Sequence, residues 1–273
     1  AIRARSSWKK EKDFEYVAGV IDGDGNFALR SKKNGEKVLN SIRLTMSLRD
    51  IEVLKRVRHI LGCGSIKSYG SLSLYCISKK VEMQRVVELL NGHIRLKVPN
   101  FVQACKGYKI EFKEANYSIA ENSPYLSGLI DADGSVYFDY STNKITLALE
   151  FQKIIYTEKL NFDKTICGVS PKVYKLIKHN QTKGKEFYSI RFVFCPKVSS
   201  MIHVYNFIMK ARNYSDFKFY RIMQIKNFIE IRNFKNSPKG SEEHRSYSKW
   251  VLNFITHLDP GYKKKSYIKN LTL

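Results

Sequence analysis

The chain has 273 residues, enough for one large domain or two of ordinary size, and its 43% of hydrophobic residues can supply a substantial core. Its 48 Lys and Arg against 25 Asp and Glu give a formal net charge of +23, which indicates a polyanionic partner such as nucleic acid. No apolar stretch approaches the roughly 18 residues of a membrane span. Five cysteines without a CxxC pair argue against a zinc site or a disulfide framework and favour a reducing interior.

The first predicted element is a buried helix that ends in acids. Residues 17–25 read VAGVIDGDG, an apolar run that leads directly into Asp22 and Asp24. We expect Gly25 to close the helix in the left-handed conformation that glycine tolerates. Both carboxylates then lie at the negative pole of the helix dipole, where cations are preferred. A positive group is therefore expected to compensate them.

Two hairpins and two helices follow in the first half. Residues 26–33 and 39–48 form the first predicted hairpin, with a turn at Asn34-Gly35. In its second strand apolar and polar residues alternate, which is typical of a half-buried strand. The next predicted elements are a helix over 49–62, a hairpin over 64–78 and a helix over 79–92.

The chain then repeats this order. Residues 126–134 read LSGLIDADG and match the first motif at a constant offset of 109 residues. Strands are predicted over 135–140 and 145–152, followed by looser counterparts of the helix, hairpin and helix over 157–168, 170–194 and 196–210. Each half thus reads αββαββα, an α+β fold. The predicted division is a first repeat over 10–118, a second over 119–235 and a basic C-terminal extension over 236–273.

Small residues in both motif helices predict that the two helices pack together. Ala18 and Gly19 in one helix, and Ser127 and Gly128 in the other, allow close approach. Packing would bring four carboxylates to two adjacent negative helix ends. Hard divalent cations bound by carboxylate and carbonyl oxygens would relieve the repulsion, and phosphodiester hydrolysis uses such ions.

At these residues the sequence resembles the LAGLIDADG homing endonucleases of the single-chain, two-motif type, from about residue 14 to about 235. The resemblance implies two pseudo-symmetric halves, each with a saddle-shaped antiparallel sheet and helices on one side, and the motif helices at the central interface. It implies that Asp24 and Asp133 are catalytic acids that bind Mg²⁺ or another divalent cation. The carbonyls of Gly23 and Ala132 would complete the coordination, with no organic cofactor. Asp22 and Asp131 would instead serve the helix interface or cap it.

The resemblance also implies a basic residue near the acids in each half and a water-organising Gln at the end of the second strand. Lys97 in HIRLKVPNF is the basic candidate of the first half, and Arg212 in MKARNYSDF is that of the second. Gln152 fits the glutamine position. The first half has Leu48-Arg49-Asp50 there without a Gln, so the two strands of a substrate need not be cut at equal rates.

Outward-facing strand residues are the candidates for reading DNA, because Arg, Ser and Thr can hydrogen-bond base edges in the major groove. The predicted contacts are Arg30, Lys32, Arg43, Thr45, Lys67, Tyr69, Tyr137, Asp139, Thr146, Glu150, Lys175 and Arg191. Since the halves differ strongly in sequence, the target should be asymmetric. Its length should be on the order of two helical turns of duplex.

Three functions remain open on the sequence. The first is a monomeric endonuclease for double-stranded DNA in intron homing, which leaves short 3′ overhangs. The second is an intron RNA maturase on the same fold. The third is a DNA-binding regulator without catalysis, against which the presence of both acids counts. We expect an intracellular location and leave open whether it is a mitochondrion or chloroplast.

Overall fold

The computed structural model describes residues 2–179 and 186–272, and its first half follows the predicted order. The elements are α1 (Ile2–Asp24), β1 (Gly25–Ser31), β2 (Lys37–Ser47), the 3₁₀ turn η1 (Leu48–Asp50), α2 (Ile51–Leu61), β3 (Ser65–Tyr69), β4 (Leu72–Ile77), α3 (Lys80–Leu90) and α4 (Val98–Gly107). Helix α4 was not predicted. It packs against β1 and β2 and so completes the helical layer of this half.

The second half repeats the order with one weaker element. It comprises α5 (Pro124–Asp133), β5 (Ser135–Asp139), β6 (Lys144–Gln152), α6 (Ile155–Lys159), β7 (Lys172–His179), β8 (Glu186–Val193), α7 (Ser200–Ala211), α8 (Asp216–Met223) and α9 (Ile225–Ile231). The helix predicted over 157–168 is wrong for most of its length. Only a five-residue helix forms, and the chain then runs irregularly, because Asn161 and Thr165 hydrogen-bond to the connection between the halves.

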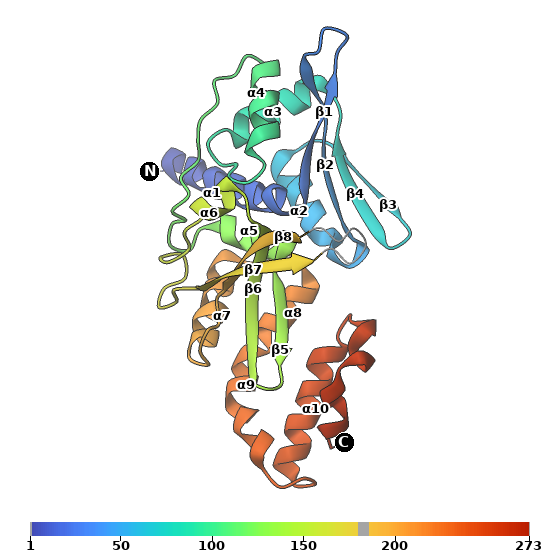
Figure 1. Ribbon diagram of the computed structural model, residues 1–273. Helices are drawn as coiled ribbons and strands as arrows, with labels where there is room; N and C mark the ends of the chain where they lie inside the picture. Colours follow the sequence, from blue (N-terminus) through green and yellow to red (C-terminus); the bar gives the residue numbers. More distant parts are fainter. Residues whose placement is uncertain (1, 180–185, 273) are drawn as a thin grey trace.

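Each half has one four-stranded antiparallel sheet, as predicted. The strand orders are β1-β2-β4-β3 and β5-β6-β8-β7, so the two sheets have the same topology. Helices lie on one side of each sheet, and α1 and α5 lie side by side where the halves meet (Figure 1). No helix of residues 2–179 and 186–272 is long and apolar enough to cross a membrane.

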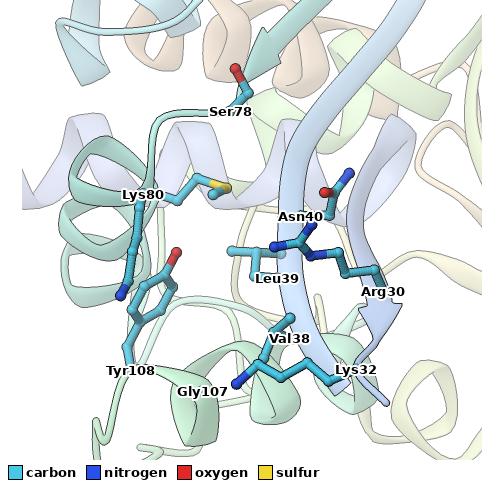
Figure 2. Close-up of a pocket in the computed structure, with 10 residues that line it drawn as sticks. Arg30, Lys32, Val38, Leu39, Asn40, Ser78, Lys80, Gly107 and Tyr108 are labelled. Atoms are coloured by element: carbon cyan, nitrogen blue, oxygen red, sulfur yellow. The ribbon is translucent and has the colours of Figure 1, made fainter. Parts of the chain in front are cut away.

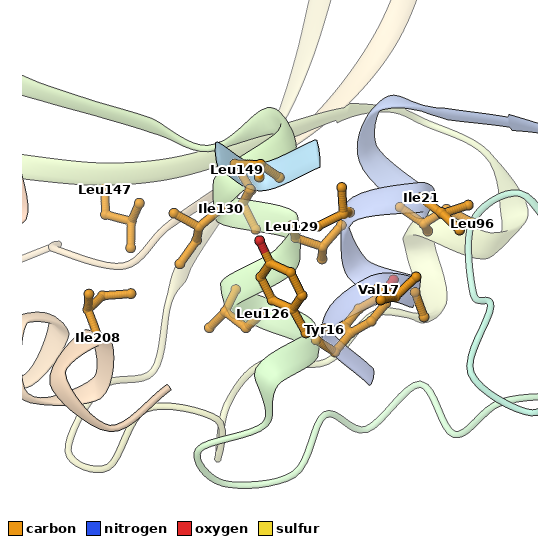
Figure 3. Close-up of a cluster of buried hydrophobic side chains, with 14 of the residues drawn as sticks. Tyr16, Val17, Ile21, Leu96, Leu126, Leu129, Ile130, Leu147, Leu149 and Ile208 are labelled. Atoms are coloured by element: carbon orange, nitrogen blue, oxygen red, sulfur yellow. The ribbon is translucent and has the colours of Figure 1, made fainter. Parts of the chain in front are cut away.

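The central helix pair is packed through glycine. A methyl group built on Gly19 would lie 2.2 Å from the carbonyl oxygen of Tyr125, and one on Gly128 would lie 2.2 Å from that of Tyr16. The predicted contact of small residues is therefore present at backbone distance. Apolar side chains surround it, among them Val17, Ile21, Leu126, Leu129 and Ile130 (Figure 3).

The glycines that end the motif helices act differently from the prediction. Gly134 has φ −66° and ψ 136°, and Gly25 is not among the glycines with positive φ, so the expected left-handed conformation of Gly25 is wrong. Each helix passes straight into a strand. A Cβ at Gly25 would lie 2.5 Å from the carbonyl oxygen of Ile21, and one at Gly134 equally close to that of Ile130. Glycine is therefore required at these two positions because a side chain would not fit, and not because the backbone is left-handed.

The C-terminal extension packs on the second half and does not form a separate core. It contains α10 (Glu242–Thr256) and two 3₁₀ turns, η3 (Pro260–Lys264) and η4 (Ser266–Asn270). Trp250 and Phe254 of α10 contact Phe138 of β5 edge to face, and Tyr267 stacks on Tyr140. The extension thus lies beside β5, as Figure 1 shows.

Candidate nucleic-acid cleavage site

The acidic ends of α1 and α5 meet. A Cβ on Gly23 would lie 2.4 Å from the Cβ of Ala132 and 3.2 Å from a carboxylate oxygen of Asp133. Asp24 and Asp133 are both partly buried. Two motifs that are 109 residues apart in the sequence therefore place their last acids at one point of the molecule.

These two acids repel each other in a desolvated place. Burial and then the nearby charge of Asp133 raise the pKa of Asp24 to about 6, against the opposing charges of Lys218 and Lys97. Burial also raises the pKa of Asp133. The site offers paired carboxylates as hard oxygen donors, which is the chemistry that a divalent cation prefers. The donor set thus fits such an ion, although no group of three His, Cys, Asp or Glu suited to a metal occurs among the described residues.

Asp22 and Asp131 lie at the helix interface, as predicted, and each organises a loop of its own half. Asp22 accepts hydrogen bonds from the backbone N–H groups of residues 95–97 at 2.7–3.0 Å, and Asp131 accepts from those of residues 214 and 215 at 2.8 and 3.1 Å. Each also accepts a tyrosine hydroxyl across the interface. Tyr125 donates to Asp22 at 2.9 Å, and Tyr16 donates to Asp131 at 2.8 Å.

Removing either tyrosine hydroxyl should destabilise the helix interface. Tyr16→Phe and Tyr125→Phe each remove one donor from a fully desolvated carboxylate, so we expect a loss of about 1.5–3 kcal/mol in the free energy of unfolding. Urea denaturation of each variant measures it. Tyr69→Phe is the matched control, because Tyr69 is 60% exposed and its change should be near zero. Equal stability of all three variants would contradict this role.

One predicted cation lies at the site and the other does not. Lys97 is half-buried at the start of α4, and its charge lowers the pKa of both Asp24 and Asp133. The choice of Arg212 is wrong. Its backbone carbonyl accepts from Ser127, and its side chain lies near Lys12, Pro124 and Tyr214, at the opposite end of α5 from Asp133.

Lys218 is the cation of the second half that the sequence analysis missed. It is only 7% exposed, and its ammonium donates to the carbonyl oxygens of Ile130, Asp131 and Ala132 at 2.6–2.9 Å. These are carbonyls of the last turn of α5, which carries the negative pole of the helix, although that of Ile130 also accepts from the N–H of Gly134. Lys218 therefore supplies the positive charge that the sequence led us to expect. It also contacts the Ala132 carbonyl that was predicted as a metal ligand.

Hydrogen bonds of the structure identify Lys218 as the counterpart of Lys97. Three residues after Lys97, Asn100 donates to the carbonyl of Phe27, and three residues after Lys218, Arg221 donates to that of Val136. Phe27 and Val136 are themselves 109 residues apart, the offset of the motifs. The segments KVPN (97–100) and KFYR (218–221) are thus structurally equivalent. Their sequences share only the lysine, so the alignment could not be made from the sequence.

Substitutions of Lys218 and Arg212 should show which of the two contributes to cleavage. Lys218→Met replaces the ammonium by an apolar group of similar length, and we expect DNA cleavage to fall by about 100-fold, as for loss of one donor to a developing charge. Arg212→Met is the matched control and should change the rate by about twofold or less, since Arg212 is distant from the acids. Single-turnover cleavage of a plasmid measures both. A larger loss at Arg212 than at Lys218 would refute the correction.

Gln152 ends β6 and is exposed. The pairing registers identify its counterpart. Asn26 and Ser135, each two residues after a motif acid, pair with Arg43 and Ala148. Ser47 lies four residues after Arg43, and Gln152 lies four residues after Ala148. Ser47 is therefore the counterpart of Gln152 in the first half, a position that the sequence analysis gave to Leu48-Arg49-Asp50. The halves remain different there, as expected.

The predicted DNA contacts of the first half share one sheet face. Thr45 and Lys67 both pair with Leu74, and Ser47 and Tyr69 both pair with Leu72, so these side chains point to the same side. Arg43, Thr45, Lys67 and Tyr69 are exposed, whereas Ile42, Leu44 and Met46 are buried on the other face. Arg30 and Lys32 are exposed at the β1–β2 hairpin.

Two of the second-half candidates are misplaced. Thr146 is 2% exposed and is not available to a ligand. Lys175 pairs with buried Ile190, so it lies on the helix side of the sheet, and the prediction for both residues is wrong. The register places Tyr174 on the outward face instead, opposite Arg191. Lys178 also lies there, as its ion pair with Glu150 shows.

The remaining outward residues of the second half form polar pairs. Arg191 donates to the hydroxyl of Tyr137 at 2.8 Å, and Glu150 accepts from Ser189 at 3.0 Å. Asp139 accepts from the hydroxyls of Ser141 and Thr142 in its own turn. Any ligand on this face has to exchange these bonds for its own.

A basic hollow of about 420 Å³ lies apart from the paired acids (Figure 2). It is formed between the β1–β2 hairpin, the start of α3 and the end of α4, and Arg30, Lys32, Asn40, Lys80 and Tyr108 line it. None of its lining residues is acidic, so it is not a metal site. It enlarges the positive surface beside the predicted DNA face.

Comparison with known proteins agrees with this geometry. A family model described as LAGLIDADG endonuclease matches residues 17–106, which span the first motif, both hairpins and most of α4. Residues 17–106 are therefore similar to the LAGLIDADG endonucleases. The second half lies outside the matched residues, but it repeats the motif and the strand order of the first half.

Relatives of this chain carry two kinds of name. The chain is 27% identical to the intron-encoded DNA endonuclease ai2a of Dictyostelium discoideum, over 99% of this chain and 84% of that protein. It is also 27% identical over 171 residues to the intron-encoded RNA maturase bI4 of Saccharomyces cerevisiae, which covers 56% of this chain and 26% of that protein.

Solved LAGLIDADG structures share the fold. A mutant of I-SmaMI aligns with a TM-score of 0.53 and 14% identity over 91% of this chain and 99% of that one. I-GzeII, solved in complex with its DNA target, aligns with a TM-score of 0.50 and 12% identity over 88% of this chain and 97% of that one.

Proposed function

We propose that this protein is a site-specific endonuclease that hydrolyses both strands of a long, asymmetric DNA duplex with divalent metal ions and leaves short 3′ overhangs. The observation that carries the proposal is the meeting of Asp24 and Asp133 at the tips of α1 and α5, from which the sheets of the two halves begin. The relative named as a DNA endonuclease over nearly the whole chain supports it.

Metal ions would be held by the carboxylates of Asp24 and Asp133, together with the Gly23 carbonyl and a remaining lone pair of the Ala132 carbonyl. When bound, Mg²⁺ activates water and stabilises charge on the attacking and leaving oxygens of the phosphodiester. Lys97 and Lys218 place positive charge beside the scissile phosphates. Gln152 at the end of β6 offers hydrogen bonds to water, and Ser47 takes the corresponding place in the first half.

The duplex would lie across the two outward faces. Arg43, Thr45, Lys67 and Tyr69 would read one half-site, and Tyr137, Glu150 and Arg191 the other. Arg30, Lys32 and Asp139 would contact the outer base pairs. Because Lys and Arg exceed acids by 23, phosphate contacts should make the affinity strongly dependent on salt.

A cleavage selection tests the proposal. The full chain is incubated with a randomised duplex library and Mg²⁺, and the ends of the cut molecules are sequenced. We expect one asymmetric sequence with staggered ends, and no products when EDTA replaces the metal. Products without a common sequence, or none at any metal concentration tried, would contradict site-specific cleavage.

An intron RNA maturase is the second candidate, and the similarity to bI4 favours it. The same positive faces would bind a folded intron RNA. Splicing of a precursor RNA containing the host intron, with and without the protein, tests this activity. Intron homing, a monomeric state and an organellar location stay predictions, for which the intron-encoded relatives are the support.

A further inference from the structure

A buried acid of the first half contacts the second half beside the catalytic centre. Asp50 ends the turn after β2 and is only 7% exposed. Its carboxylate accepts a hydrogen bond from the hydroxyl of Ser215, which is 165 residues away in the sequence and fully buried. This contact joins the end of one half's sheet to the start of the other half's helix α8.

Ser215 is the residue that positions α8. Its side chain caps the helix by accepting from the N–H of Lys218 at 3.3 Å, and its own N–H donates to Asp131 at 3.1 Å. A capping side chain fixes the first turn of a helix. Lys218 lies in that turn, so its ammonium reaches the last carbonyls of α5, one residue before Asp133.

The C-terminal extension braces the same contact. Arg49, next to Asp50, donates to the carbonyl of Leu258, and Arg221 forms an ion pair with Asp259 at 3.2 Å. The guanidinium groups of these two arginines lie 4.1 and 4.0 Å from the ring centroid of Phe217, which follows Ser215 by two residues. The extension thus holds the turn after β2 against α8.

The first half has a different arrangement at Lys97. Lys97 is itself the N-cap of α4 and caps it without a side-chain hydrogen bond, and its loop is held by the carboxylate of Asp22. The support of Lys218 by the other half and by the extension is therefore an asymmetric feature of this chain.

We propose that Asp50 is a positioning residue that holds Lys218 at the second catalytic centre through Ser215. This inference rests on the proposed function. Since a duplex has twofold symmetry like the paired halves, each centre should serve one strand. Loss of Asp50 should therefore slow one strand selectively.

Strand-resolved cleavage tests the inference. The target duplex carries a different fluorophore on each strand, and both are followed in single turnover. Lys218→Met identifies the strand that depends on this lysine. Asp50→Ala should slow that strand by about 10- to 100-fold, the range expected for a misplaced group, so that a nicked intermediate accumulates. Asp50→Asn keeps an acceptor oxygen for Ser215 and should restore most of the rate.

Two controls define the mechanism. Glu52→Ala removes an exposed acid of the same half that pairs with Lys55, and should leave both strands unchanged. Asp50→Ala combined with Ser215→Ala should be no slower than Ser215→Ala alone, because the two residues act in series. Equal slowing of both strands by Asp50→Ala, or no slowing, would overturn the inference.

A second measurement does not depend on cleavage. Lys218 is buried and held by three carbonyls, so an amine-acylating reagent should label it slowly in the native protein. Asp50→Ala should increase the labelling of Lys218 several-fold in peptide mass spectrometry, while labelling of exposed Lys55 stays constant. Unchanged labelling of Lys218 would overturn the inference, whether or not the protein cuts DNA. Absence of any DNA cleavage would instead contradict the proposed function.

Discussion

Asp24→Asn is expected to abolish double-strand cleavage, because one of the two strands is no longer cut, and to leave DNA binding intact. The substitution keeps the size of the side chain and removes one of two carboxylates whose mutual repulsion creates the cation site. We expect the rate of double-strand cleavage to fall by at least about 1,000-fold, because metal-assisted activation of water is lost at one centre. Asp133→Asn should act in the same way at the other centre.

Binding should persist or tighten in both variants. Each removes a negative charge that faces a polyanion, so repulsion of the phosphate backbone decreases. Electrophoretic mobility shifts in EDTA measure the affinity, and single-turnover cleavage in Mg²⁺ measures the rate. If Asp24→Asn cuts at the wild-type rate, the assignment of Asp24 as the metal-binding acid is wrong.

Asp22→Asn is the matched control, two residues earlier on the same helix. Asp22 is fully desolvated and accepts three backbone N–H groups and the hydroxyl of Tyr125. The amide group of Asn can accept with one oxygen only, so two of the four donors lose their partner. This variant should therefore lose stability by about 1–3 kcal/mol. Urea denaturation would distinguish this effect from the loss of chemistry at Asp24.

Much of the fold could be predicted from the sequence because its signals are local and repeated. The constant offset between the motifs identified the two halves, and alternation in residues 42–47 identified the buried face of β2. Leu48, which was predicted on the same face, begins η1 instead and is 41% exposed. Apolar runs that end in paired acids placed Asp24 and Asp133 together without further information. These features depend only on the period of the pattern and on composition.

The errors at the site come from registers that the sequence does not encode locally. Lys175 faces the helix side because β7 pairs with β8 through a single register, and a shift of one residue would have turned it outward. Thr146 belongs to an alternating strand yet is covered, so period alone did not decide its exposure. Both depend on neighbours that are distant in the chain.

Lys218 escaped prediction for a related reason. The stretch Asn213–Ser215 before α8 is irregular, and it is held by Asp131 from a helix more than 80 residues earlier. Only that contact places the first turn of α8 beside the end of α5. Arg212 is closer in sequence to the second motif than Lys218 is. However, Arg212 is the C-cap of α7, and its own backbone, with φ 51°, directs the chain so that its side chain lies away from the acids.

The largest stability effect is expected at the crossing of the central helices. Gly19→Ala and Gly128→Ala would each place a methyl carbon 2.2 Å from a carbonyl oxygen of the partner helix. Since the obstacle is backbone, no side-chain rotation can relieve it, and the helices must separate. We expect each variant to lose at least about 3 kcal/mol of unfolding free energy, despite the better helix propensity of alanine.

Gly107→Ala separates this steric effect from helix propensity. Gly107 ends α4, and a Cβ there would meet no atom within 4 Å, so this variant should be neutral or more stable by up to about 1 kcal/mol. Urea denaturation compares the three. If the Gly19→Ala variant is as stable as the Gly107→Ala variant, the two central helices do not cross at backbone distance. In that case Asp24 and Asp133 would not meet either, because the same crossing sets the separation of the helix ends.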